Sequence, residues 1–405
     1  MESRRQAASL PLLTLQEALD LLGVSRATVD RWRQNRGLPC IKIGREVYFD
    51  EEELQRWIRS QASVRDLGSP GAGGEEPLTL TLGYQSGTAH MWSSLVIKGL
   101  RLLEDELSLL QPARRIAVRW RDAASGLELV EELIAGQVQI AALGDYPIAM
   151  SAALSRVLPR FNSVLLALDG KAARGRGIAL AVPRSFSLRS LSDLAAHTVA
   201  TVPHSSADHR LQTLLAPLGT RQPQVIHQQM PENLRSIACE SVGASVMWEP
   251  YPSLLDYSGQ GRLLFAEGLG GDYLTGLAAD QTWVTGHEDI VIAYLKAHLR
   301  AHALLREQPG KMAKLVAREA SLPLAVASQV LSRVRWDAAV YTRDLETLQG
   351  IMGSASCAYE PPGSGLSGRT LMYRGEYLQE AARRLRYPAV GESAVIGDWS
   401  ERILL

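Results

Sequence analysis

The chain has 405 residues, with 46% apolar and 21% charged composition and with 43 basic residues balanced by 43 acidic ones. A chain of this length and composition can bury a sizeable core and form two or three lobes. No run of about 18 or more uninterrupted apolar residues is present, so we expect no membrane span. Three widely spaced cysteines exclude a disulfide framework and fit a reducing cytoplasm.

The first predicted element is an amphipathic helix after residue 14. A basic pair and a short apolar run precede it, but that run contains Pro11 and leads directly into the helix, so we expect no export signal. Thr14 and Glu17 have the spacing of a capping box, in which each side chain bonds the other residue's backbone N–H. Gly23 can adopt the left-handed conformation that ends a helix.

The next residues predict a second helix, a β-hairpin and a third helix. Ser25 is a good N-cap for a helix from Arg26 to Arg36. Short β-prone runs then flank residues 44 and 45, a Gly-Arg pair that favours a two-residue turn. Asp50 and Glu53 repeat the capping pattern before a last helix. A tight helical pair followed by a hairpin is typical of a winged helix-turn-helix, which places one helix in a DNA major groove.

The charge of this segment supports the same interpretation. Residues 26–45 contain six cations and one acid, a local excess of +5 in a chain that is balanced overall. A solvated helical face is the simpler explanation for a basic helix. The helix caps, the turn glycine and the hairpin occur together here, however, and they favour contact with phosphates.

Residues 12–59 resemble the excisionase and MerR-type helix-turn-helix family. The matching runs are GVSRATVDRW, LPCIKIGREVYF and DEEELQRWI. The resemblance implies DNA contacts from the second helix and from the wing, at Arg26, Thr28, Arg31, Arg33, Lys42 and Arg45. One small winged domain contacts few bases, so we expect a homodimer on paired half-sites of double-stranded DNA.

Composition then divides the chain into segments. We predict a DNA-binding domain at 1–62, a Gly- and Pro-rich flexible linker at 63–77, a two-lobed domain at 78–350 and a helical extension at 351–405. Between 78 and about 280, β-prone runs alternate with helical ones. This alternation indicates α/β lobes with largely parallel sheets.

The loops that follow the predicted strands carry aromatic and hydrogen-bonding side chains. Ligands of such sheets bind at the carboxyl ends of strands, so these loops predict a small-molecule cleft. Acids beside aromatic faces suit an amino or cationic group, and a serine pair at a helix start suits an anionic or polar group, although a serine there is equally an N-cap. The candidate ligand contacts are Tyr84, Gln85, Thr88, His90, Asp145, Tyr146, Ser205, Ser206, His209, Trp248, Glu249, Asp272 and Tyr273.

Residues 78–350 resemble the two-lobed periplasmic solute-binding proteins of the nitrate, sulfonate and thiamine-precursor group, which are related to pyrimidine-synthase domains. The matching runs are LGYQSGTAHMW, ELIAGQVQIAALGDYP, SLSDLAAHTVATVPHSSADHR and VMWEPYPSLL. The resemblance implies a type II periplasmic-binding-protein fold. The chain would enter a second lobe near residues 180–183 and leave it near 280, and the lobes would close on a ligand.

Together the segments predict a cytoplasmic, ligand-responsive transcription regulator that binds a polar, nitrogenous or sulfonate-like molecule. An importer's substrate-binding component is one alternative, and a pyrimidine-synthase-like enzyme is another, with Lys171 as its candidate amine. His90, Asp208 and His209 lack metal-ligand spacing. We therefore expect no catalytic residues, no metal and no cofactor.

Overall fold

The computed structural model describes residues 12–22, 26, 29, 33, 38–43, 46–50, 78–110, 115–359 and 371–405. The chain divides into two compact units, Met1–Glu75 and Glu76–Leu405, and each is described here by itself. In the described residues, no helix combines the length and the apolar character that crossing a bilayer requires.

The N-terminal unit contains a helix and a small antiparallel sheet. Its elements are β1 Leu12–Thr14, α1 Leu15–Leu22, β2 Ile41–Ile43 and β3 Glu46–Asp50, and the strands are ordered β1-β3-β2. The predicted capping box is confirmed, because Thr14 N donates to Glu17 Oε2 (2.8 Å) and Glu17 N donates to Thr14 Oγ1 (3.3 Å). The predicted hairpin is confirmed by the pairing of β2 with β3.

A compact apolar cluster holds this unit together. Its fully or almost fully buried members are Ala18, Val29, Leu38 and Phe49. Residues 26, 29 and 33 are helical, as the predicted second helix requires. Strand β1 was not predicted, and the predicted third helix after residue 50 lies outside the described residues.

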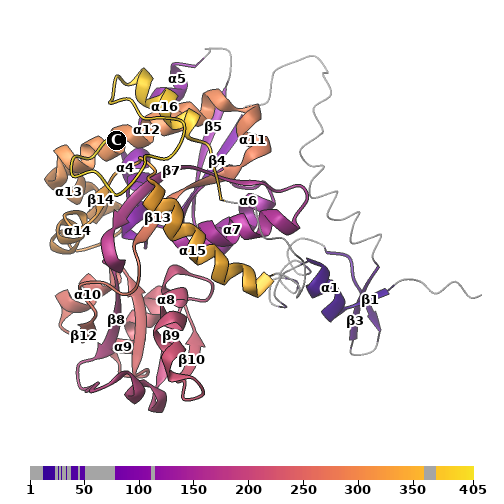
Figure 1. Ribbon diagram of the computed structural model, residues 1–405, viewed down its shortest axis with the longest axis vertical. Coiled ribbons are helices and arrows are strands. Elements are labelled where there is room, and N and C mark those ends of the chain that lie inside the picture. Colours follow the sequence, from indigo (N-terminus) through magenta and orange to yellow (C-terminus); the bar gives the residue numbers. More distant parts are fainter. Residues whose placement is uncertain are drawn as a thin grey trace, which may run out of the picture. The chain divides into compact units, whose positions relative to one another are not determined.

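The first lobe of the larger unit is built on a mixed sheet. The sheet order is β14-β7-β13-β6-β4-β5, with β15 beside β7. Helices pack around it and enclose an extensive apolar core (Figure 1). The strands are β4 Leu78–Tyr84, β5 Ile116–Asp122, β6 Ile140–Gly144, β7 Ser163–Ala172, β13 Tyr273–Asp280, β14 Arg335–Trp336 and β15 Met372–Tyr373. The helices are α4 Ser93–Leu100, α5 Leu102–Ser108, α6 Gly126–Ile134, α7 Asp145–Val157, α11 Gln281–Gly286, α12 Glu288–Glu307, α13 Pro309–Glu319, α14 Leu324–Leu331, α15 Thr342–Tyr359 and α16 Gly375–Arg384.

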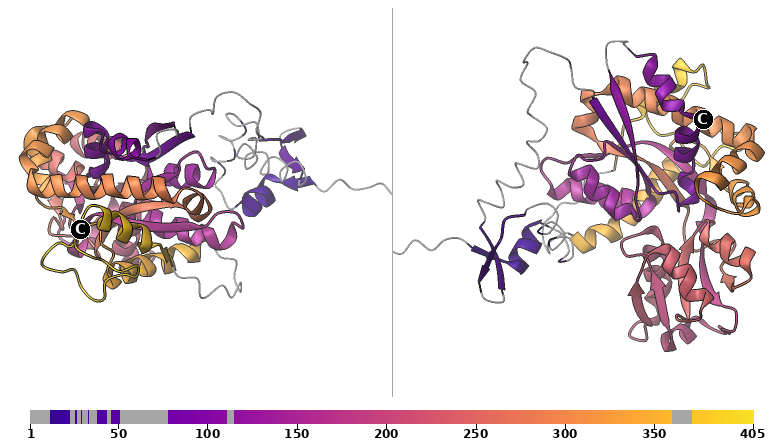
Figure 2. Two further views of the ribbon diagram at one scale, coloured as in Figure 1. Left: turned by 90° about the horizontal axis from the view of Figure 1, so that it is seen from above. Right: turned by 180° about the vertical axis from the view of Figure 1, so that it is seen from behind.

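The second lobe has its own five-stranded sheet and its own core. The strand order is β10-β9-β11-β8-β12, and β9 runs parallel to both β10 and β11. Figures 1 and 2 show this lobe as a separate body at one end of the larger unit. Its elements are β8 Ile178–Pro183, β9 Thr198–Thr201, α8 Ser206–Leu215, β10 Gln224–His227, α9 Met230–Ala238, β11 Ala244–Trp248, α10 Tyr251–Ser258 and β12 Gly261–Leu264.

The connections between the lobes differ in part from the prediction. Strand β8 already belongs to the second sheet, whereas β13 belongs to the first, so the return precedes Tyr273 and does not occur near Asp280. Strand β13 was missed because its run YLTGLAAD is buried at every position and shows no alternation. Helices α4 and α5 are separated at Arg101, whose φ of 55° is left-handed.

The C-terminal part of the chain packs on the first lobe. Helix α15 begins at Thr342, before the predicted extension, and contacts α7, while α16 contacts α12. The fully buried Lys171 of β7 donates to Asp344 Oδ2 (2.8 Å), and Trp399 Nε1 donates to the same carboxylate (2.6 Å). A buried ion pair therefore joins the sheet to α15, and a hydrogen bond from Trp399 connects the last residues of the chain to the same carboxylate.

Candidate functional site

Two cavities that share part of their walls lie between the lobes. The larger has a volume of about 350 Å³, within the range of sites for small organic molecules. It is lined by Gln85, Ser86, Gly87, Thr88, Asp122, Ala123, Ala124, Gln229, Met230, Pro231, Trp248 and Tyr251. The smaller has a volume of about 10 Å³, room for about one water molecule, and is lined by Gln85, Thr88, Met91, Gly126, Gly144, Pro147, Ser205, Ser206, Trp248 and Tyr273.

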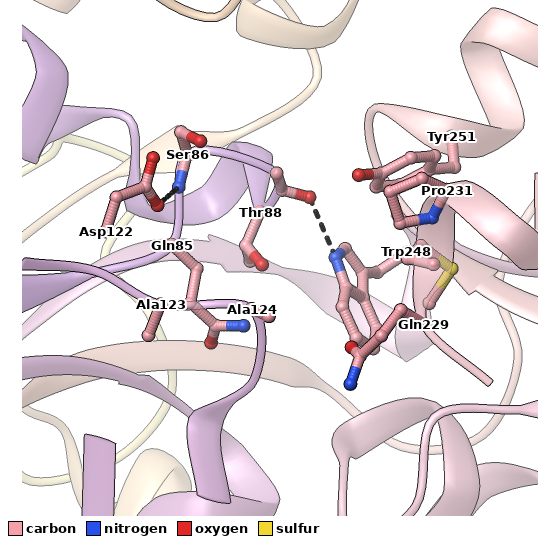
Figure 3. A pocket seen from close by; sticks show the side chains of 12 residues that line it. Gln85, Ser86, Thr88, Asp122, Ala123, Ala124, Gln229, Pro231, Trp248 and Tyr251 are labelled. Carbon is pink, nitrogen blue, oxygen red and sulfur yellow. Dashed lines mark hydrogen bonds between the residues drawn. The ribbon is translucent and has the colours of Figure 1, made fainter. Parts of the chain in front are cut away.

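The loop after β4 forms the first-lobe wall of the larger cavity. Ser86 N donates to Asp122 Oδ1 (2.9 Å), which joins this loop to the end of the neighbouring strand β5 (Figure 3). Gln85 and Thr88 are 6% and 2% exposed, and both line both cavities. These two predicted contacts lie where the loops after neighbouring strands come together, because parallel neighbours end at one edge of the sheet.

Aromatic side chains from the second lobe form the opposite wall. Trp248 Nε1 donates to the Gly87 carbonyl (2.9 Å), so the indole is fixed across the cleft (Figure 3). Burial raises the pKa of the Tyr251 hydroxyl to about 12. A Cβ at Gly87 would lie 2.8 Å from that hydroxyl, so the absence of a side chain there lets the walls approach.

The N-terminal ends of several helices face these cavities. An α-helix start presents unpaired backbone N–H groups and a partial positive charge, which together favour an anionic or polar group. The wall residues at helix starts are Gly126 of α6, Gly144 before α7, Ser205 and Ser206 at α8, Gln229, Met230 and Pro231 at α9, and Tyr251 of α10.

Of the two roles considered for the serine pair, the structure shows the N-cap. Ser205 is the N-cap of α8, since its Oγ accepts from Asp208 N (3.2 Å) and donates to the Val202 carbonyl (2.6 Å). Ser206 lies against the first lobe, because a Cβ at Gly144 would be 2.7 Å from its Oγ. Both serines line the smaller cavity.

A buried ion pair joins the two lobes beside this point. Arg210 of α8 donates from Nη2 to Asp145 Oδ2 of α7 (2.7 Å), and their side chains are 4% and 0% exposed. Further N–H groups of the same guanidinium donate to the carbonyls of Leu269 (3.1 Å) and Asp272 (2.9 Å) in the returning connection. Asp145, predicted as a ligand contact, is therefore engaged by a protein cation and lines neither cavity.

Two predicted histidines are close to this ion pair but do not line the cavities. His90 is 1% exposed and packs against the ring of Tyr273 at a centroid distance of 4.6 Å. Burial lowers the pKa of His90 to about 3, so the ring is neutral near pH 7. The ring of His209 stacks on Tyr146 at 5.6 Å, and burial lowers its pKa as well.

Three more predicted contacts have partners elsewhere. Tyr84 accepts from Lys98 Nζ (3.1 Å) inside the first lobe. Glu249 accepts from Ser253 Oγ (2.9 Å), and burial raises the pKa of this carboxyl. Asp272 is bound by Arg343, with Nε 2.6 Å from Oδ2. These acids are used within the protein, since a buried carboxylate is stable only when it is paired.

The structure describes some of the predicted DNA contacts. Arg26 is exposed on its helix. Arg33 is half-buried, and its Nε donates to Cys40 Sγ (3.2 Å), so part of this side chain packs on its own domain. Lys42 belongs to β2. Thr28, Arg31 and Arg45 lie outside the described residues.

Comparison with known proteins supports both halves of this architecture. Residues 12–62 match the family model described as a helix-turn-helix domain. No curated protein sequence matches the chain at a significant level.

The larger unit has the fold of the periplasmic solute-binding proteins. The alkanesulfonate-binding protein SsuA from Xanthomonas axonopodis pv. citri, bound to MOPS, is 22% identical over 71% of this chain and 96% of its own, with a TM-score of 0.57. The aliphatic sulphonate binding protein SsuA from Escherichia coli is 20% identical over 69% and 92%, with a TM-score of 0.55. The nitrate-binding protein NrtA from Synechocystis PCC 6803 is 14% identical over 77% and 90%, also at 0.55. The chain thus joins a helix-turn-helix domain to a solute-binding fold.

Several residues of the cleft were not predicted from the sequence. Tyr251, Gln229 and Asp122 line the larger cavity, and Arg210 fixes the approach of the lobes. Tyr251 could have been found, since it follows the predicted contacts Trp248 and Glu249 directly. Nothing local to Arg210 indicates that its partner lies 65 residues earlier in the chain.

Proposed function

We propose that this chain is a cytoplasmic, ligand-responsive transcription regulator. The helix-turn-helix domain would bind double-stranded DNA as part of a homodimer, and the two-lobed unit would bind a small molecule. The observation that carries this proposal is the presence, in one chain, of a matched helix-turn-helix domain and a cavity of about 350 Å³ between two lobes.

The walls of the cleft favour a ligand with an anionic or strongly polar end. The starts of α9 and α10 lie at the wall of the larger cavity and supply partial positive charge for that end, while Trp248 and Tyr251 offer faces for an organic body. The acids suggested for a cationic group, Asp145, Glu249 and Asp272, are already paired. Asp122, the carboxylate on the wall of the larger cavity, accepts from Ser86 N through Oδ1. Among the nitrogenous and sulfonate-like ligands considered, we therefore favour a sulfonate or carboxylate, in keeping with the sulfonate- and nitrate-binding proteins of similar fold.

Ligand binding can supply enough free energy to switch such a protein. A micromolar ligand contributes about 8 kcal/mol of binding free energy. Moving an equilibrium between two states from 1:99 to 99:1 requires a difference of about 5.5 kcal/mol between their affinities. A cleft that holds its ligand only when both walls are in contact with it would provide that difference.

The test has a ligand arm and a DNA arm. A thermal-shift screen of alkanesulfonates, carboxylates and nitrate on the full chain should find compounds that raise the unfolding temperature. A gel-shift titration with the intergenic DNA beside the gene should show a log–log salt slope of about −0.9 per phosphate neutralised. A flat salt response would refute DNA binding, and a screen without any stabilising compound would refute this ligand class.

The alternatives make different predictions. An importer's substrate-binding component shares the larger unit's fold, and finding the mature protein outside the cytoplasmic membrane by cell fractionation would favour it. The enzyme alternative relied on Lys171 as an amine nucleophile. Lys171 is fully buried, and its Nζ donates to Asp344 Oδ2 (2.8 Å) and to the Ala339 carbonyl (2.6 Å), away from both cavities.

A further inference from the structure

A second polar cluster lies inside the first lobe, among residues that line neither cavity. Asp169 belongs to β7, and His298 and His302 are four residues apart on α12. All three side chains are fully buried. One ligand atom from each residue, a carboxylate oxygen or a ring nitrogen, lies within 4.8 Å of the other two.

Hydrogen bonds define which ring nitrogens carry protons. His298 Nε2 lies 2.9 Å from the Leu168 carbonyl, which can only accept, so this nitrogen is protonated. His302 Nε2 lies 2.9 Å from Asp169 Oδ1, and a metal ion bound to both atoms would take the place of the proton between them. The neutral His298 ring carries its lone pair on Nδ1. This Nδ1 atom is buried and has no hydrogen-bond partner among the described residues.

A buried lone pair of this kind is unfavourable unless a donor or a cation binds it. Two histidines separated by four residues lie on the same side of a helix, which is a common arrangement of metal ligands. Imidazole nitrogen and carboxylate oxygen are ligands of Zn²⁺ and of similar transition metals, whereas Mg²⁺ and Ca²⁺ prefer oxygen alone.

The surroundings hold these ligands in place. The Leu168 carbonyl orients the His298 ring through Nε2, and Ser93 Oγ donates to Asp169 Oδ2 (2.6 Å), which fixes the carboxylate. Metal-binding histidines and carboxylates commonly have such outer hydrogen bonds. Because Ser93 begins α4, the cluster also connects three elements of the lobe.

We propose that Asp169, His298 and His302 form a structural binding site for a divalent transition-metal ion, with Zn²⁺ as the best match. The metal would tie α12 to β7, the strand that leads toward the first connection between the lobes. The site is separate from the cleft and does not depend on the proposed regulatory function.

The test uses the full chain, stripped with a chelator, loaded with ZnCl₂ and passed through gel filtration. Metal analysis should find about one Zn²⁺ per chain, as in structural sites. The unfolding temperature should rise with the logarithm of free Zn²⁺, because the metal binds only the folded state. His298→Gln and His302→Gln should each lose the metal and the stabilisation, while His227→Gln, at an exposed position of β10, should keep both.

Two results would overturn the proposal. In the first, the chain retains no Zn²⁺ and its unfolding temperature does not change, which would mean that no metal ion binds the cluster. The other is Zn²⁺ retention that is unchanged in folded His298→Gln and His302→Gln variants. If these variants do not fold, Co²⁺ absorption of the unaltered chain decides: nitrogen-ligand bands support the site, and the spectrum of aqueous Co²⁺ refutes it.

Discussion

The two units of this chain use arginine in opposite ways. In the helix-turn-helix unit, Arg26 is exposed on a helix within a segment of +5 net charge. In the larger unit, Arg210 is 4% exposed and is bound to Asp145 and to backbone carbonyls. Exposed charges act over about a Debye length and are screened by salt, whereas buried pairs are screened far less. One unit can therefore attract a charged partner, while the other uses charge to fix its own geometry.

The largest effect should come from breaking the buried pair. Arg210→Met leaves Asp145 as an unpaired buried carboxylate, which should lower the free energy of unfolding by about 3–5 kcal/mol. Chemical denaturation of the full chain measures this change. Arg189→Met, which removes an exposed arginine of the second lobe, is the matched control and should be nearly neutral.

A double variant tests whether the lost stability comes from leaving a buried charge without its partner. The double variant Asp145→Leu with Arg210→Met should be more stable than Arg210→Met alone, because no charge remains buried without a partner. A single variant that loses less than about 1 kcal/mol, the value typical of an exposed pair, would contradict the account of this contact.

The next effect concerns the exposed arginine. Arg26→Ala should weaken DNA binding by about 1.5–3 kcal/mol, the contribution of one hydrogen bond to a charged group. It should also reduce the magnitude of the log–log salt slope by about 1. Gel-shift titrations at several salt concentrations measure both, and Arg189→Ala is the control of equal charge change. If the affinity and the salt slope do not change, Arg26 does not contact DNA.

A third effect is a pH dependence inside the larger unit. Burial holds the pKa of His90 at about 3, below its ordinary value of 6.5, so the unfolded state binds more protons between these values. The contribution of His90 is therefore complete above pH 6.5 and is lost as pH falls toward 3, by at most about 1.4 kcal/mol per pH unit. Chemical denaturation at a series of pH values gives the slope of the unfolding free energy against pH. His90→Gln should remove the contribution of His90 to this slope, and the exposed His227→Gln should leave the slope unchanged. Equal slopes for both variants would contradict the burial effect.

The smallest effect is expected at the first helix of the helix-turn-helix unit. Thr14→Ala removes the oxygen that accepts from Glu17 N, which should destabilise this unit by about 1 kcal/mol. Thr14→Ser keeps the oxygen and should be close to the original. Thermal unfolding followed in the N-terminal unit distinguishes them, and similar losses in both variants would show that the cap contributes little.

Local signals predicted local structure well. The Thr14–Glu17 capping box, the hairpin around residues 44 and 45 and the Ser205 cap all depend on residues within a few positions of one another. Strand β13 depends instead on neighbours more than a hundred residues away, such as Ser163 opposite Asp280. Its uninterrupted buried run, with Gly276 inside it, gave no periodic signal.

The same distinction applies to the cleft. Loops at strand ends could be predicted, and Gln85, Thr88, Ser205, Ser206, Trp248 and Tyr273 do line the cavities. The pairing of the candidate acids with cations of the protein could not be predicted, because the partners are remote in sequence. Asp272 and Arg343, for example, are 71 residues apart. The spacing of His298 and His302 was visible in the sequence, but Asp169 joins them only through the fold.

The central claim is that ligand in the cleft and DNA on the helix-turn-helix affect each other within one chain. The most direct measurement is DNA affinity, by fluorescence anisotropy at fixed salt, with and without a saturating compound from the thermal-shift screen. We predict that the compound changes DNA affinity at least about fivefold and that DNA changes the affinity for the compound by the same factor. Equal DNA affinity in both conditions, with the compound demonstrably bound, would contradict the account.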